Sequence, residues 1–340
     1  MWRPMRALAM SAVVLVAVAC SDQSPSALHP GGPGARRVEG LWWLLFWISL
    51  IVCVMITAGV LLVVRRRRRA APVDNRDPTR FVLIAGAAVP FVVLAVVFGI
   101  SLGDNDFISK PVGGTHPGDA LTIEVIGHQW WWEVRYPHGS PAVLANEIHI
   151  PVDTDVQLKL TTADVLHSFW VPQLMPKTDL IAGRTNMMWM RADRPGNYRG
   201  QCAEYCGMQH GHMAFMVIAQ PKSEFDSWLQ WASRPAPTPA DPALLHGLSI
   251  FGQAGCASCH SIRGTDAAGT VGPDLTTIGD RWSLGAGTVP NDDEHLRAWV
   301  SNPQQFKPGI AMPPQAISPA ELPDLIAYLR SLRPTPQEAR

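Results

Sequence analysis

Two long apolar runs near the N-terminus set the main constraint on how this chain folds. Residues 41–64 and 81–103 contain no charged side chain, and each run is long enough to cross roughly 30 Å of hydrocarbon as a helix. Five consecutive arginines, residues 65–69, follow the first run directly. Because short basic loops stay in the cytoplasm, we predict a membrane hairpin with a cytoplasmic loop at 65–80. Residues from about Asp104 onward would then lie on the extracytoplasmic side.

The first 20 residues have the pattern of a secretory signal. Arg3 and Arg6 precede an apolar stretch, residues 7–19, that is too short to span a bilayer. Small residues precede Cys20, as at a bacterial lipoprotein cleavage site where the cysteine becomes acylated. We therefore predict a signal peptide over residues 1–20 that is of the lipoprotein type. Plain cleavage and an uncleaved anchor are the alternatives.

The net charge and the spacing of the cysteines limit the classes of function that this chain can have. The formal net charge is zero and charged residues make up 16% of the chain, so no strong field points to a nucleic-acid partner. Four of the six cysteines form two close pairs, Cys202 with Cys206 and Cys256 with Cys259. Such spacing indicates metal or haem attachment before it indicates disulfide bonds.

Residues 119–222 show the pattern of a β domain. Runs such as 121–125 and 156–160 alternate apolar and polar residues, and proline, glycine and aspartate separate them. Period-two alternation predicts strands with one buried face. We therefore expect an antiparallel β sandwich or barrel of roughly 100 residues.

Within this domain, the loop 202–213 carries a concentrated set of metal-binding side chains. Cys202, Cys206, His210 and Met213 offer two thiolates, an imidazole and a thioether, a soft and borderline set that favours copper. Two cysteines four residues apart allow two sulfurs to bridge two ions. A Cys202–Cys206 disulfide and a zinc site are the alternatives, and a methionine ligand argues against zinc.

Two further histidines bear on this loop. A second ion needs its own imidazole, and His167, 35 residues before Cys202, is the candidate. His212 lies close to the other ligands, but His210 has the spacing to both Cys206 and Met213. We therefore predict that His212 is not a ligand.

Residues 40–222 resemble the CuA domain of cytochrome c oxidase subunit II, a cupredoxin-like β barrel preceded by two membrane helices. The motifs that carry the resemblance are residues 127–132, 167–172, 177–179, 183–186 and the cysteine loop. The resemblance implies a binuclear copper centre, with ligands at Cys202, Cys206, His167, His210, Met213 and the backbone carbonyl of Glu204.

The resemblance also implies roles outside that ligand set. Trp130 would be the residue at which electrons enter, and the Glu204 carboxylate would reach a magnesium ion at the boundary with subunit I. The family carries a glutamate seven residues before the proline of the second membrane helix, where it helps to feed a proton channel. Here the proline is Pro90 and the equivalent position is Leu83. That role must be absent or supplied elsewhere.

A second extracytoplasmic domain follows a proline-rich linker. Residues 235–242 predict a stiff, extended connection, and residues 243–333 form the unit beyond it. Cys256, Cys259 and His260 make a C-x-x-C-H pattern, which attaches c-type haem and supplies one axial ligand.

Met312 is the candidate for the opposite axial ligand. It is the only methionine after the haem motif and lies in a proline-containing loop, whereas His295 falls in a predicted helix. Residues 272–275 resemble the loop of class I cytochromes c that orients the proximal histidine. We expect the tether and an apolar contact near Trp130, rather than opposite charge, to hold the two domains together.

These features predict a multi-domain chain: a two-helix transmembrane hairpin, an all-β cupredoxin-like CuA domain and an all-α cytochrome c domain. The resemblance implies a multi-pass subunit of a proton-translocating oxidase in the bacterial inner membrane, without an oxygen-reducing site of its own. Its partners would be subunits I and III and an external cytochrome or other electron donor. A nitric oxide or nitrous oxide reductase component and a membrane-tethered electron carrier are the alternatives.

Overall fold

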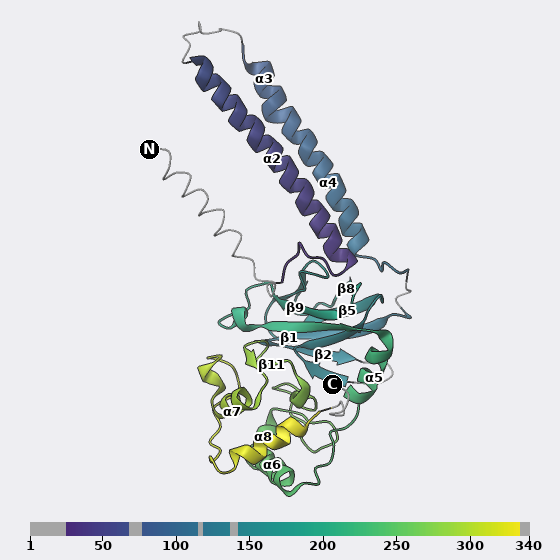
Figure 1. Cartoon of the computed structure of the whole chain (residues 1–340), viewed down its shortest axis with the longest axis vertical. Coiled ribbons are helices and arrows are strands. Elements are labelled where there is room, and N and C mark those ends of the chain that lie inside the picture. The colour runs from purple at the N-terminus through teal and green to yellow at the C-terminus, as the bar shows by residue number, and fades with distance from the viewer. Residues whose placement is uncertain (1–24, 68–76, 115–117, 137–141, 334–340) are drawn as a thin grey trace, which may run out of the picture.

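The computed structural model describes residues 25–67, 77–114, 118–136 and 142–333, which form a helical hairpin, a β sandwich and a smaller helical unit (Figure 1). The predicted signal peptide with Cys20 lies outside the described residues, as do residues 68–76 of the predicted cytoplasmic loop.

The hairpin consists of α2 (Pro33–Arg67) and a second helical run made of α3 (Thr79–Leu83), the π-helical turn Ile84–Ala88 and α4 (Val89–Ile108). Both runs are long and apolar enough to cross a membrane, and their apolar side chains point outward, as a lipid-facing surface requires. Leu83 is 59% exposed at the end of α3.

The hairpin is joined to the β sandwich at the start of α2. The Gly31 amide donates to the Gln173 carbonyl at 2.6 Å, and the Ala35 amide donates to the Leu174 carbonyl at 3.1 Å. At the same end of the hairpin, Arg37 of α2 contacts Asp104 of α4 at 3.4 Å and links the two helices. The two backbone hydrogen bonds attach the start of α2 to Gln173 and Leu174 of the sandwich.

The sandwich consists of two five-stranded sheets, with strand orders β3-β2-β1-β5-β8 and β4-β10-β9-β6-β7. Most neighbouring strands are antiparallel, while β1 pairs with β5 and β4 pairs with β10 in parallel. Apolar residues at alternate positions face inward from both sheets and form one core, as the period-two pattern predicts. The strands are β1 (Leu121–His128), β2 (Trp131–Tyr136), β3 (Ala142–Ala145), β4 (Glu147–Pro151), β5 (Val156–Thr162), β6 (His167–Trp170), β7 (Thr178–Leu180), β8 (Asn186–Met190), β9 (Gly196–Cys202) and β10 (Ala214–Gln220).

The copper-ligand candidates lie at one end of this core. A cluster of aromatic rings supports them: the Trp132 ring packs edge-on against Phe169 and Phe215, with centroids 5.7 and 5.2 Å away. Helix α5 (Lys222–Ala232) then leads away from β10 toward the linker. A short 3-10 turn, His210–His212, shapes the cysteine loop before β10.

The helical unit packs against the sandwich on the side away from the membrane hairpin (Figure 1). Its helices α6 (Pro242–Gln253), α7 (Asp293–Ser301) and α8 (Leu322–Ser331) enclose a second core, and α6 crosses α8 where Gly247 meets the α8 backbone. The two-residue strands β11 (Ser283–Leu284) and β12 (Val289–Pro290) add a small hairpin. The predicted fold class is confirmed.

Candidate copper centre and haem cavity

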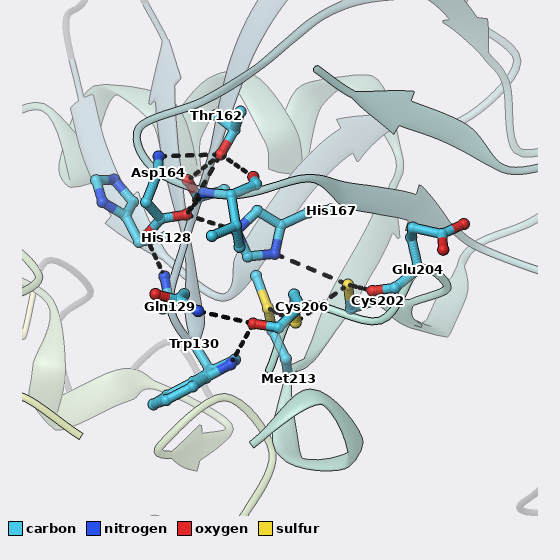
Figure 2. Close-up of polar contacts among 12 residues, drawn as sticks. His128, Gln129, Trp130, Thr162, Asp164, His167, Cys202, Glu204, Cys206 and Met213 are labelled. Atoms are coloured by element: carbon cyan, nitrogen blue, oxygen red, sulfur yellow. Dashed lines mark hydrogen bonds and ion pairs between the residues drawn. The ribbon is translucent and has the colours of Figure 1, made fainter. Parts of the chain in front are cut away.

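The structure brings the six candidate copper ligands together from three segments of the sandwich, and Figure 2 labels all of them except His210. His167 begins β6, Cys202 ends β9, and the others follow Cys202 in the loop that leads to β10. The Cys202 Sγ lies 3.8 Å from Cys206 Sγ, 3.9 Å from His167 Nδ1 and 3.2 Å from the Glu204 carbonyl. The Cys206 Sγ lies 3.6 Å from His210 Nδ1 and 3.7 Å from Met213 Sδ.

These spacings fit a shared coordination sphere. Nitrogen and sulfur donors held about 2.0–2.3 Å from one tetrahedral ion lie roughly 3.3–3.8 Å apart. The observed donor separations run from 3.2 to 3.9 Å, and the two cysteines are free rather than bonded to each other. Two thiolates, two imidazoles and a thioether form a soft donor set, which suits copper.

The electrostatics of the thiol pair also favour a cation. The contact with Cys206 lowers the pKa of Cys202 to about 3, and the contacts with His167 and the Glu204 carbonyl act in the same direction. The same contact with Cys202, together with burial, raises the pKa of Cys206. The contact between the two sulfurs therefore favours one thiolate in the pair, the form of cysteine that binds a metal ion.

His167 is held in place by its neighbours on both sides of the ring. Its Nε2 contacts the Asp164 carboxylate at 2.8 Å, so Nδ1 is left to face Cys202. Gly127 of β1 lies against the other side, where a Cβ would come within 2.8 Å of the ring. A carboxylate that orients a ligand histidine is a common support of metal sites.

The predicted haem residues line one cavity of about 430 Å³ in the helical unit: Cys256, Cys259, His260 and Met312. The His260 Nδ1 donates to the Pro273 carbonyl at 2.8 Å, which leaves Nε2 available to an iron atom. Gly272 allows this approach, because a Cβ there would come within 2.5 Å of the imidazole. Burial lowers the pKa of His260, which favours the neutral form that binds a metal.

The Arg281 side chain also lines the cavity, and sequence reasoning did not identify it. Its guanidinium donates to the Asp274 carbonyl and is buried, yet its Nε has no hydrogen-bond partner among the described residues. A buried cation with an unused donor fits the carboxylates that a haem carries. The four predicted residues and this orphaned donor together fit a haem.

The wall of the haem cavity includes Trp130 from the sandwich. The Trp130 Nε1 donates to the Cys206 carbonyl at 3.0 Å, and the Gln129 side chain donates to the same oxygen at 2.8 Å (Figure 2). Trp130 therefore touches both candidate cofactor sites. No sequence signal could have shown the bond to Cys206, because 76 residues separate the partners.

The structure separates the two competing histidines from these sites. The His212 Nδ1 contacts the Gln209 side chain at 2.8 Å and His212 is exposed, whereas His210 Nδ1 faces Cys206 Sγ at 3.6 Å. His295 lies on α7, where its Nδ1 contacts Asp292 at 2.7 Å. Neither contact brings a histidine nitrogen toward the other candidate copper ligands or into the haem cavity.

Both the β sandwich and the helical unit resemble known protein families. The model for the cytochrome c oxidase subunit II periplasmic domain matches residues 141–220, and the model for cytochrome c matches residues 245–333. A cytochrome c oxidase subunit 2 from Alkalihalophilus pseudofirmus is 33% identical over 336 residues, covering 96% of this chain and 97% of the relative. A cytochrome c oxidase subunit 2 from Bacillus subtilis is 28% identical, with 98% of each chain covered.

Among solved structures, the periplasmic domain of subunit II of cytochrome oxidase from Bradyrhizobium japonicum is 33% identical, with a TM-score of 0.32. It matches 33% of this chain and 92% of its own. The family models imply copper in the sandwich and haem in the helical unit, and subunits of this kind work with other oxidase subunits and an electron donor. With a full-length relative above 30% identity, the chain belongs to the cytochrome c oxidase subunit 2 family and carries a cytochrome c domain at its C-terminal end.

Proposed function

We propose that this chain passes electrons from an external donor to subunit I of a haem-copper terminal oxidase, where oxygen is reduced to water and protons are translocated. When bound, a haem on Cys256 and Cys259 and a dicopper centre in the cysteine loop would each supply reversible one-electron chemistry. One observation carries the proposal: Trp130 lines the haem cavity and donates a hydrogen bond to the Cys206 carbonyl.

Each group of side chains would then have a separate task. His260 and Met312 would bind the haem iron, and a His/Met ligand pair raises the haem potential as a donor to copper requires. Arg281 would face the haem carboxylates. Two thiolates shared by two coppers would spread one charge over both ions. In addition, the contacts that hold His167 and Cys202 in place would keep geometric change at the copper site small during electron transfer.

The copper set would consist of the residues that the sequence indicated. Cys202, Cys206, His167, His210, Met213 and the Glu204 carbonyl would together hold the two copper ions. The Glu204 carboxylate is 38% exposed and contacts Lys177 at 3.3 Å. A magnesium ion at the boundary with subunit I would use this carboxylate.

In this proposal residues 41–64 and 81–103 cross the bacterial inner membrane, and domains at 119–222 and 243–333 lie on its extracytoplasmic side. The arginine run after the first span supports this orientation. Subunits I and III would be the membrane partners, and a cytochrome or another reduced carrier would be the donor. Oxygen reduction would take place in subunit I rather than in this chain.

The test uses the intact detergent-solubilised complex. Photoreduction of the haem should be followed by bleaching of the mixed-valence copper absorption and then by oxygen consumption. Haem oxidation without copper reduction would contradict the proposed path. Turnover of nitric or nitrous oxide in place of oxygen would assign the chain to a nitrogen-oxide reductase instead.

A further inference from the structure

Lys307 is a buried lysine at the junction of the two extracytoplasmic units. It is the last lysine of the chain, 85 residues after Lys222. Its side chain follows the short 3-10 turn Pro303–Gln305 and is 2% exposed. A lysine is almost never buried to this extent unless its charge has partners, so its surroundings require an explanation.

The ammonium group of Lys307 donates to three backbone carbonyls. The acceptors are the oxygens of Trp130 at 2.8 Å, His212 at 2.5 Å and Gly285 at 2.7 Å. The three bonds use all three hydrogens of the ammonium. A planar guanidinium could not converge on three carbonyls around one point, so arginine would not replace it.

These carbonyls belong to both units. Trp130 and His212 lie in the two loops of the sandwich that border the copper ligands, and Gly285 lies beside β11 of the helical unit. Lys307 itself belongs to the helical unit and lines the haem cavity. The side chain therefore ties two copper-domain loops to the wall of the haem cavity.

Other contacts across the same junction are consistent with a fixed arrangement. The Gln209 side chain donates to the Pro308 carbonyl at 2.7 Å, and the Ala214 amide donates to the Ala286 carbonyl at 2.9 Å. The Trp282 amide donates to the Glu147 carboxylate. The junction near Trp130 therefore contains directed hydrogen bonds, which fix orientation better than an apolar patch does.

We propose that Lys307 is a positioning residue that fixes the cytochrome domain on the copper domain with its haem cavity against Trp130. Electron transfer between the two sites then takes place within one rigid body, without a diffusive search by a tethered domain. The inference rests on the proposed function, because it concerns the transfer step between those sites. It goes beyond that function in naming what holds the two sites together.

The energetics favour a positioning role over simple stabilisation. With 2% of Lys307 exposed, its location is costly for a charge, and the same burial lowers the pKa of the ammonium to about 7. An apolar side chain would fill the same space without that cost, so a buried charge is weak support for stability. A buried polar group that satisfies several partners can instead specify one arrangement.

The experiment compares Lys307→Met and Lys307→Gln in the intact complex with Lys222→Met. Lys222 is exposed and pairs with Asp226 on α5, so its variant removes the same charge outside the junction. Three measurements apply to each: the haem and copper spectra, the haem-to-copper transfer rate after photoreduction, and amide exchange at Ala214 and Trp282.

For Lys307→Met we expect unchanged spectra, transfer slowed about tenfold or more and made dependent on solvent viscosity, and faster exchange of both amides, since three buried carbonyls lose their donor. Lys307→Gln, which keeps part of the donor capacity, should lie between this variant and wild type. Transfer rates and exchange equal to those of Lys222→Met in both variants would overturn the inference.

Altered haem or copper spectra in both Lys307 variants would also overturn it, since Lys307 would then hold the sites themselves. A wild-type complex without any haem-to-copper transfer would contradict the proposed function instead. Amide exchange would still report docking in that case, so the two failures are distinguishable.

Discussion

The indole nitrogen of Trp130 donates a hydrogen bond to the backbone carbonyl of Cys206 at 3.0 Å. The Trp130 ring also forms part of the haem cavity, while Cys206 carries one of the two sulfurs of the copper candidate. One side chain therefore connects two sites whose sequence motifs lie about fifty residues apart.

Replacing Trp130 tests the connection directly. Trp130→Phe keeps an aromatic ring but removes the N–H donor, at a cost of about 0.5–1.5 kcal/mol in unfolding free energy. We expect slower haem-to-copper transfer with unchanged haem and copper spectra, measured by photoreduction. Trp228→Phe, which alters a tryptophan stacked on His149, should leave the rate unchanged. Equal rates in both variants would argue against a role for Trp130.

The two neighbouring histidines of the cysteine loop should differ in copper binding. His210→Ala removes the imidazole that lies 3.6 Å from Cys206 Sγ, and we expect loss of the mixed-valence dicopper EPR signal. His212→Ala removes an exposed ring that contacts Gln209, and the signal should persist. The opposite pattern would make His212 the ligand.

Asp164 orients His167 without being a ligand itself. Asp164→Asn keeps the shape of the side chain but removes the charge that faces His167 Nε2. Loss of such support lowers metal affinity about 10–100-fold. Competition with a copper chelator should show this change. Asp179→Asn is the control, since that carboxylate pairs with Lys177 instead, and equal affinities would remove Asp164 from the site.

Met312 should set the haem potential. Met312→His replaces the thioether by an imidazole, so we expect the midpoint potential to fall by a sizeable part of the roughly 0.8 V that axial ligands span. A redox titration of the haem measures this shift. His295→Ala should leave the potential unchanged, because His295 contacts Asp292 outside the cavity. If the midpoint potential fell only in the His295→Ala variant, His295 rather than Met312 would be the axial ligand.

Arg281 should stabilise the reduced haem. Arg281→Gln removes a buried positive charge from the cavity, and the more positive oxidised haem then becomes easier to form. We expect a lower midpoint potential with the haem still covalently attached, measured by redox titration of the haem. Arg297→Gln on α7 provides the control. An unchanged potential would place Arg281 away from the haem carboxylates.

The sequence alone determined those features that depend on local spacing. Uncharged runs followed by arginines indicate membrane helices, alternation indicates strands, and C-x-x-C-H indicates a haem-attachment site within five residues. The copper loop is local in the same sense, since Cys202, Cys206, His210 and Met213 fall within twelve residues. Only His167 had to come from a distant strand.

The tertiary structure alone decided how the two sites are related. The Trp130 indole bonds to a carbonyl 76 residues away, and Lys307 bonds to one that is 177 residues away. Such partners meet only because the strand order of the sandwich and the docking of the cytochrome domain place their loops together. Lys307 and Arg281 look like ordinary basic residues in the sequence, but the fold buries them at the junction and in the wall of the haem cavity. A charge removed from water needs partners, and only the tertiary structure decides which groups lie close enough to serve.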